Sequence, residues 1–87
     1  MSSELAWKDL NRLAVLAADK ADDTSLSIPD RERWLFMAVR LNDGEGTPGD
    51  LRAAAELAEL TGARETDAKV RQRYFDLAGR AVAAAAR

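Results

Sequence analysis

The sequence predicts an all-α domain that folds as a compact four-helix bundle. Ala, Leu and Arg are the commonest of its 87 residues and β-branched residues are few, a composition that favours helix. In four segments, apolar side chains recur every three to four positions, which is the spacing of one helix face. Clusters of Gly, Pro, Asp and Ser separate these segments. At this length we expect a single domain, residues 1–87.

The first helix is expected from about residue 3 to residue 19 or 20. Ser2 or Ser3 can cap it, and Glu4 suits the positive end of the helix dipole. Its apolar stripe consists of Leu10, Leu13, Ala14 and Ala17, widened by Trp7 and Leu16. The turn-forming stretch 22–29, which closes on Pro29, should end the helix.

The second helix is expected from Pro29 to about Leu41, because Pro fits the first turn of a helix. One stripe contains Trp34, Met37, Ala38 and Leu41. Leu35, Phe36 and Val39 make the segment apolar around most of its circumference, so we expect this helix to be central. Residues 42–47 form the clearest loop of the chain.

The third helix should begin near Pro48, with Thr47 as its cap and Asp50 in the position of a capping-box acid. Its inward positions are expected to be Leu51, Ala54, Leu57, Ala58 and Leu60, with Gly62 as the C-terminal stop. The fourth helix should begin between Ala63 and Asp67, with Thr66 as a cap. Its stripe consists of Val70, Tyr74, Leu77, Ala81 and Ala84, broadened by Phe75, Ala78 and Val82.

The chain also reads as two helical hairpins of about forty residues, one over about residues 3–41 and one over about residues 48–86. "RERWLFMAVR" (31–40) and "RQRYFDLAGR" (71–80) share three Arg, an aromatic residue at the fourth place and Ala at the eighth. A duplication explains this match, and so does the common geometry of two amphipathic helices. We favour shared geometry, because Ala and Leu are abundant here and solenoid repeats usually need three units.

Composition argues against catalysis. The chain has neither Cys nor His, so it lacks thiolate and imidazole chemistry, and no nucleophile is paired with a base. We expect no enzyme activity, no cofactor and no metal; the acids of "NDGEGTPGD" lack the spacing of a calcium loop. The net charge of −2 gives no global attraction to nucleic acid or to an anionic membrane. No signal peptide or membrane span is recognisable, so we expect a cytoplasmic protein.

The function favoured by the sequence is that of a small protein-interaction module, such as a regulator, an adaptor or a phage-type inhibitor. The chain has more apolar helix surface than its length easily buries, and such surplus commonly marks a contact site. Five side chains should be exposed in a monomer: Leu35, Phe36, Val39, Phe75 and Val82. The candidate partner-binding residues are Arg33, Trp34, Phe36, Arg73, Tyr74 and Phe75. Self-association would cover the same faces. Trp7 and Trp34 are expected chiefly as core anchors.

The alternative function is that of a DNA-binding regulator. "LAELTG" (57–62) has the form of a helix-turn-helix turn, and an apolar–Arg pair, two aromatic residues and a Gly follow at Val70-Arg71, Tyr74-Phe75 and Gly79. Through these residues the segment 57–80 resembles the MerR-type DNA-binding domains. The resemblance implies a recognition helix whose side chains contact duplex DNA. The residues in place to make such contacts are Arg64, Lys69, Arg71, Gln72 and Arg73.

Overall fold

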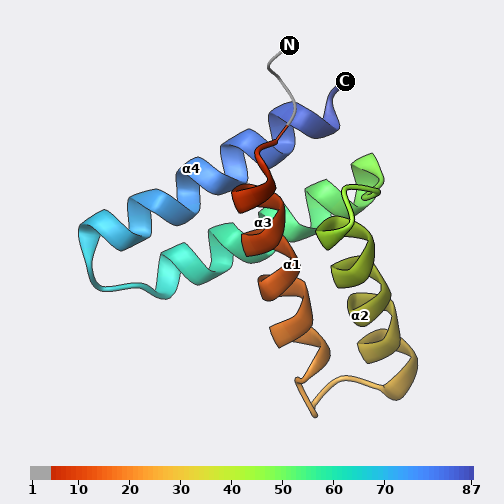
Figure 1. The fold of residues 1–87 in the computed structure, drawn as a ribbon. Helices are drawn as coiled ribbons and strands as arrows, with labels where there is room; N and C mark the ends of the chain where they lie inside the picture. Colours follow the sequence, from red (N-terminus) through yellow and green to blue (C-terminus); the bar gives the residue numbers. More distant parts are fainter. Residues whose placement is uncertain (1–4) are drawn as a thin grey trace.

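The computed structural model describes residues 5–87, and within this range the chain consists of helices joined by short loops, without strands. The helices are α1 (Trp7–Ala21), α2 (Ile28–Asn42), α3 (Pro48–Arg64) and α4 (Ala68–Ala85) (Figure 1). The prediction of an all-α fold of four helices is therefore confirmed. Each helix lies within a few residues of its predicted position.

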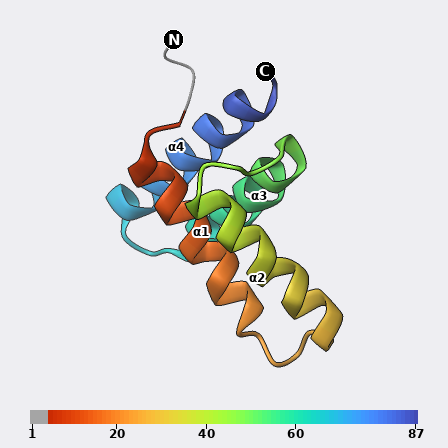
Figure 2. The same cartoon turned by 45° about the vertical axis from the view of Figure 1, so that its right-hand side comes forward.

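The helices pair in chain order as two antiparallel hairpins that cross each other (Figures 1 and 2). α1 packs along α2, α3 packs along α4, and the first half of α1 lies over the middle of the second hairpin. The molecule measures 36 × 32 × 18 Å, and its smallest dimension accommodates two layers of helices. Because of this crossing, the ends of the hairpins project beyond the contact between them.

The prediction that the second helix is central is wrong. α2 packs mainly on α1, touches only the start of α3, and buries just Ala38 and Leu41 fully. The apolar residues around its circumference suggested burial on several sides, but the crossing of the hairpins brings partners to one side only.

Side chains cap three of the four helices. Ser27 Oγ accepts a hydrogen bond from the Asp30 amide at the start of α2. The predicted capping box of α3, made by Thr47 and Asp50, is present. At α4 the cap is Asp67, one residue after the predicted Thr66. α1 begins after Ala6 without a capping side chain. The predicted contributions of residues 2–4 lie outside the described residues.

The core is built largely from alanine. Among residues 5–87, three large side chains are almost completely inaccessible to solvent, Leu13, Leu41 and Leu77. The other buried apolar residues are Ala14, Ala17, Ala21, Ala38, Ala54, Ala55, Ala58, Ala78, Ala81 and Ala85. Small side chains let helix backbones approach closely, so the helices can pack at interior density with little side-chain volume between them. The buried positions predicted on α1, α3 and α4 largely coincide with this core.

Gly62 extends the same principle to the end of the second hairpin that carries the α3–α4 turn. The predicted C-terminal stop at this position is wrong, because α3 continues to Arg64 and Gly62 is buried inside it. A Cβ atom at this position would lie only 3.0 Å from Tyr74 Cβ and 3.0 Å from Phe75 Cε1. Gly62 therefore serves the close packing of α3 on α4 rather than the end of a helix.

Two further predictions of burial are wrong. Trp7 is 73% exposed at the first residue of α1, and Leu60 is 54% exposed on α3. Leu60 matches the helical spacing but lies at the edge of its stripe, where neither hairpin covers it. Trp34, the other predicted anchor, is half-buried and packs against the core.

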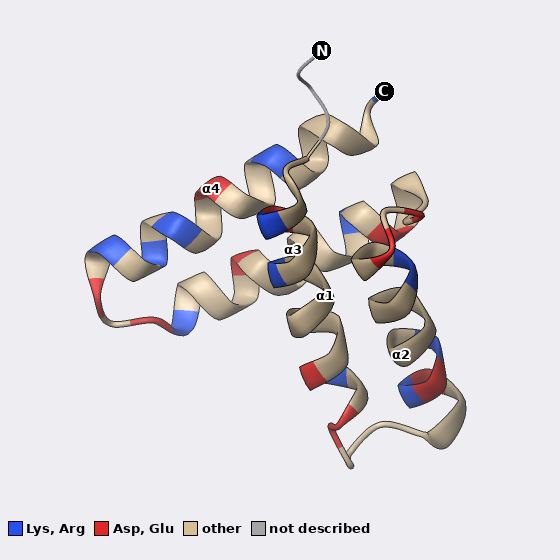
Figure 3. Cartoon of the chain, in the orientation of Figure 1, with Lys and Arg blue, Asp and Glu red and all other residues tan. Residues whose placement is uncertain are grey.

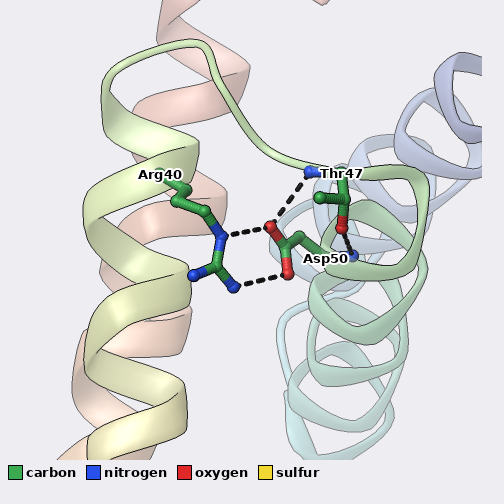
Figure 4. A network of polar contacts seen from close by, with 3 residues as sticks. All are labelled: Arg40, Thr47 and Asp50. Carbon is green, nitrogen blue, oxygen red and sulfur yellow. Dashed lines mark hydrogen bonds and ion pairs between the residues drawn. The ribbon is translucent and has the colours of Figure 1, made fainter.

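A charged cluster joins the two hairpins at the loop between α2 and α3 (Figure 4). Arg40 Nε and Nη2 donate to the two carboxylate oxygens of Asp50, at 2.8 and 2.9 Å. Asp50 Oδ2 also accepts the Thr47 amide at 3.0 Å, while the Asp50 amide donates to Thr47 Oγ1 at 3.0 Å. One buried carboxylate thus caps α3 and ties its start to the end of α2. The arginine hydrogen bond is the main cause of an Asp50 pKa below the usual 3.8.

This lowered pKa makes stability depend on pH in a defined direction. The carboxylate stabilises the fold above its unfolded pKa near 3.8, and this contribution is lost as the pH falls through the lower pKa of the folded state. We expect Asp50→Asn to cost about 1–2 kcal/mol at pH 7, since Arg40 is partly solvent-screened. The cost should shrink toward zero on acidification, as followed by urea unfolding at pH 7, 4 and 2.5. Asp43→Asn, on the exposed loop, is the control and should cost nothing; a pH-independent cost for Asp50→Asn would contradict this account.

Candidate functional site

Among the four helices, α2 carries the most exposed large apolar side chains. Ile28, Leu35, Phe36 and Val39 are 69%, 49%, 58% and 53% exposed. Residues seven or eight apart on a helix lie on the same side, so these four form one continuous strip, here named the α2 face. The strip lies away from the buried Ala38 and Leu41. Glu32 falls within it and is exposed.

The predicted residues of the second helix occupy different positions relative to this face. Phe36 is part of it. Arg33, three residues before Phe36, is a helix neighbour of that ring and is strongly exposed. Its guanidinium lies 3.6 Å from Asp30 across one turn. Trp34 packs against the core instead. Only Arg33 and Phe36 are therefore available together to a partner.

On the second hairpin, the predicted partner-binding residues also lie on different surfaces. Phe75 and Val82, which are seven residues apart, are both exposed on one side of α4. Tyr74 is half-buried and Arg73 exposed, and both line a groove toward α1. All five apolar side chains predicted to be exposed in a monomer, on α2 and α4, are confirmed as exposed.

The groove lies between α1 and α4 and was not predicted from the sequence. It has a volume of ≈ 310 Å³ and is named here the α1–α4 groove. Its lining comprises Asn11, Arg12, Val15, Leu16, Asp19, Val70, Arg73, Tyr74 and Leu77. The two segments are more than fifty positions apart in the sequence, and only the crossing of the hairpins brings them together.

A second ion pair holds the base of this groove. Arg80 Nε and Nη2 donate to the two oxygens of Asp9 at 2.8 and 3.0 Å. Asp9 lies one turn before Arg12 on α1, and Arg80 lies one turn after Leu77 on α4. The two helices diverge from this contact, and the α1–α4 groove opens between them (Figure 1). The hydrogen bond to the Asp9 carboxylate raises the pKa of Arg80.

The residues of the DNA-binding alternative share a face only in part: Lys69, Gln72 and Arg73 stand at i, i+3 and i+4 on α4 and are exposed. The predicted turn "LAELTG" is helical throughout, and the chain turns only at Glu65–Asp67. Lys69 and Arg71 are two positions apart, so they project to different sides of α4. Two of the candidate side chains make hydrogen bonds within the chain: Arg71 donates to the Glu65 carbonyl, and Gln72 donates to Asp76. Arg73 lines the groove, and Arg64 and Lys69 are exposed.

Figure 3 shows the basic positions in the N-terminal half of α4 next to the acids of the α3–α4 turn. Glu65 and Asp67 therefore lie beside the positive charges that a DNA contact would use. This arrangement does not favour the helix-turn-helix function, which stays a prediction from the sequence.

The resolved pKa shifts belong to structural contacts. The pKa of Asp50 is lowered, and the pKa values of Arg40 and Arg80 are raised by their hydrogen bonds to carboxylates. The pKa of Asp23 is also lowered, chiefly by the hydrogen bond from the Ser25 hydroxyl. Among residues 5–87, no group of three His, Cys, Asp or Glu is placed to hold a metal ion. In the same range, no helix is both long enough and apolar enough to cross a bilayer.

Comparison of the chain with protein-family models, with curated proteins and with solved structures finds no match. The function is therefore inferred from the chemistry of the surfaces themselves. Two of these surfaces differ in character: the apolar α2 face, and the α1–α4 groove with its arginines.

Proposed function

We propose that this chain is a non-enzymatic interaction module, a regulator, adaptor or inhibitor, that binds another protein through its apolar and arginine-bearing helix faces. The observation that carries the proposal is the α2 face, where four large apolar side chains lie in one exposed strip. Single exposed apolar residues are ordinary on protein surfaces, but contiguous apolar strips commonly mark contact sites.

The distribution of side-chain sizes supports this proposal. Fully buried positions of the core are mostly Ala, whereas Ile, Leu, Phe and Val occupy exposed positions on α2. Exposed Leu or Phe adds little to folding, because its surface stays in water. Burying such a side chain against a partner releases roughly 1.5–3 kcal/mol for each residue that becomes fully covered. The α2 face is therefore suited to act after folding, when a second surface covers it.

Phe36 and Arg33 are the best candidates for anchors of the contact. Aromatic residues and arginines contribute most often to the few energetically dominant positions of an interface. The Phe36 ring is 58% exposed, and the Arg33 guanidinium makes only a surface ion pair with Asp30. Such surface pairs contribute little to stability, so Arg33 can exchange its partner at small cost.

The test is affinity capture from the native host with the tagged full chain, followed by a binding titration with the captured protein. We expect Phe36→Ser to weaken partner binding at least about tenfold, because a central aromatic anchor is removed. The free energy of unfolding should stay within about 0.5 kcal/mol of the parent value, as for other surface changes. Leu60→Ser, a change at an exposed apolar residue of the other hairpin, is the control. Unchanged binding by Phe36→Ser, or the absence of any specific partner, would contradict the proposal.

A further inference from the structure

We propose that the α1–α4 groove is a second docking site, which receives one amphipathic α-helix of a partner protein that carries acidic side chains beside its apolar face. This inference rests on the proposed function in one respect, namely that the chain acts by binding protein. It concerns a different surface from the α2 face and a partner of defined chemistry.

The α1 wall of the groove has the pattern of one helix face. Arg12, Val15, Leu16 and Asp19 stand at i, i+3, i+4 and i+7. Side chains at this spacing form a ridge along one side of a helix. Val15 is half-exposed and Leu16 partly buried, so the apolar middle of this ridge is accessible.

The α4 wall repeats the pattern. Val70, Arg73, Tyr74 and Leu77 also stand at i, i+3, i+4 and i+7. Each wall thus combines apolar side chains with one arginine. Two helices that diverge and present such ridges offer the shape into which the side chains of a third helix pack. An extended peptide would gain less here, because the groove has no exposed strand edge with which it could pair.

The charges of the groove indicate which charged side chains the partner helix should carry. Within residues 5–87, neither Arg12 nor Arg73 makes an ion pair or a side-chain hydrogen bond, and both are exposed. The acid among the lining residues is Asp19, so the groove has a net charge of +1 from two arginines and one aspartate. The guanidinium group of arginine binds a carboxylate through two parallel hydrogen bonds. A helix with Asp or Glu on both flanks of its apolar face would therefore complement both walls.

A second copy of the chain is a poorer occupant. Its most exposed apolar strip, the α2 face, presents the single carboxylate Glu32 within the strip, whereas the groove offers two arginines. Docking of α2 into the groove of another copy would also join two different surfaces. Such contacts produce open chains of molecules unless the rotation closes a ring.

The experiment starts with selection of 16-residue peptides of helical pattern on the immobilised full chain, from a library that varies apolar and charged positions. We expect the selected peptides to share an apolar i, i+3 or i+4, i+7 face with Asp or Glu on its flanks. In methyl NMR spectra, the best peptide should shift the signals of Val15 and Val70. Its affinity should fall about tenfold in Arg73→Glu, and a version with Lys in place of the acids should prefer that variant.

Two controls separate this proposal from the function of the α2 face. Arg33→Glu and Phe36→Ser should leave peptide affinity unchanged, whereas Arg73→Glu should leave binding at the α2 face unchanged. Circular dichroism checks that each variant is folded. The groove proposal fails if selection yields no acidic amphipathic peptides, if the peptide shifts signals on α2 instead, or if the chain self-associates through the groove. None of these outcomes affects the test of the α2 face.

Discussion

Replacing Leu77 with Ala is expected to lower the free energy of unfolding by about 3 kcal/mol. Leu77 is a large side chain that is almost completely buried, and it lies where α4 meets the rest of the core. The substitution removes the transfer energy of the lost methyl groups and leaves a cavity. The surrounding alanines are too short to fill it, so little of this cost can be recovered. Urea unfolding followed by circular dichroism measures the change.

The control for this prediction is Val82→Ala on the same helix. Val82 is about half-exposed, so the free energy of unfolding should change by less than about 0.5 kcal/mol. If Leu77→Ala and Val82→Ala were equally mild, α4 would not be held by the packing described here. The m-values of both variants should match that of the parent, which would show that the same amount of surface is exposed on unfolding.

The second large effect is expected from a substitution that adds volume. Ala58 lies on α3, has no solvent-accessible surface, and belongs to the core in which the hairpins pack. Ala58→Leu adds three carbon atoms at a position where helix backbones approach closely. We expect a loss of about 2–3 kcal/mol, because the helices must move apart or adopt strained rotamers. Thermal and urea unfolding both report this loss.

Ala63→Leu is the matched control for added volume. Ala63 is exposed on the same helix, so the same change in chain composition should be nearly neutral. A neutral or stabilising Ala58→Leu would mean that the core has room for a large side chain. The conclusion that small residues let the hairpins approach closely would then be wrong.

Much of the fold could be predicted from the sequence because it depends on local spacing. Helical periodicity located all four helices, and the Thr47–Asp50 pair identified the start of α3 to the residue. The exposure of Leu35, Phe36 and Val39 followed from a count of apolar faces on a short chain. These features depend on residues that are close together along the chain.

The remaining features depend on how the hairpins are placed in space. The pairing of Arg40 with Asp50 and of Arg80 with Asp9 joins residues on different helices, and no spacing rule relates them. The same is true of the α1–α4 groove. The role of Gly62 does not follow from the sequence, because Gly commonly ends a helix, whereas here it permits the contact of α3 with Tyr74 and Phe75. In the sequence, the high alanine content is the feature that indicates closely packed helices.

The central claim is that the large apolar side chains of α2 form a surface for another molecule and are not part of the core. The most direct test is the urea unfolding midpoint of the double variant Leu35→Gln/Val39→Gln, measured beside Leu77→Ala. The account predicts a midpoint equal to that of the parent within error, because both side chains are about half-exposed or more. A decrease as large as that of Leu77→Ala would show that these residues hold the fold together, and would contradict the claim.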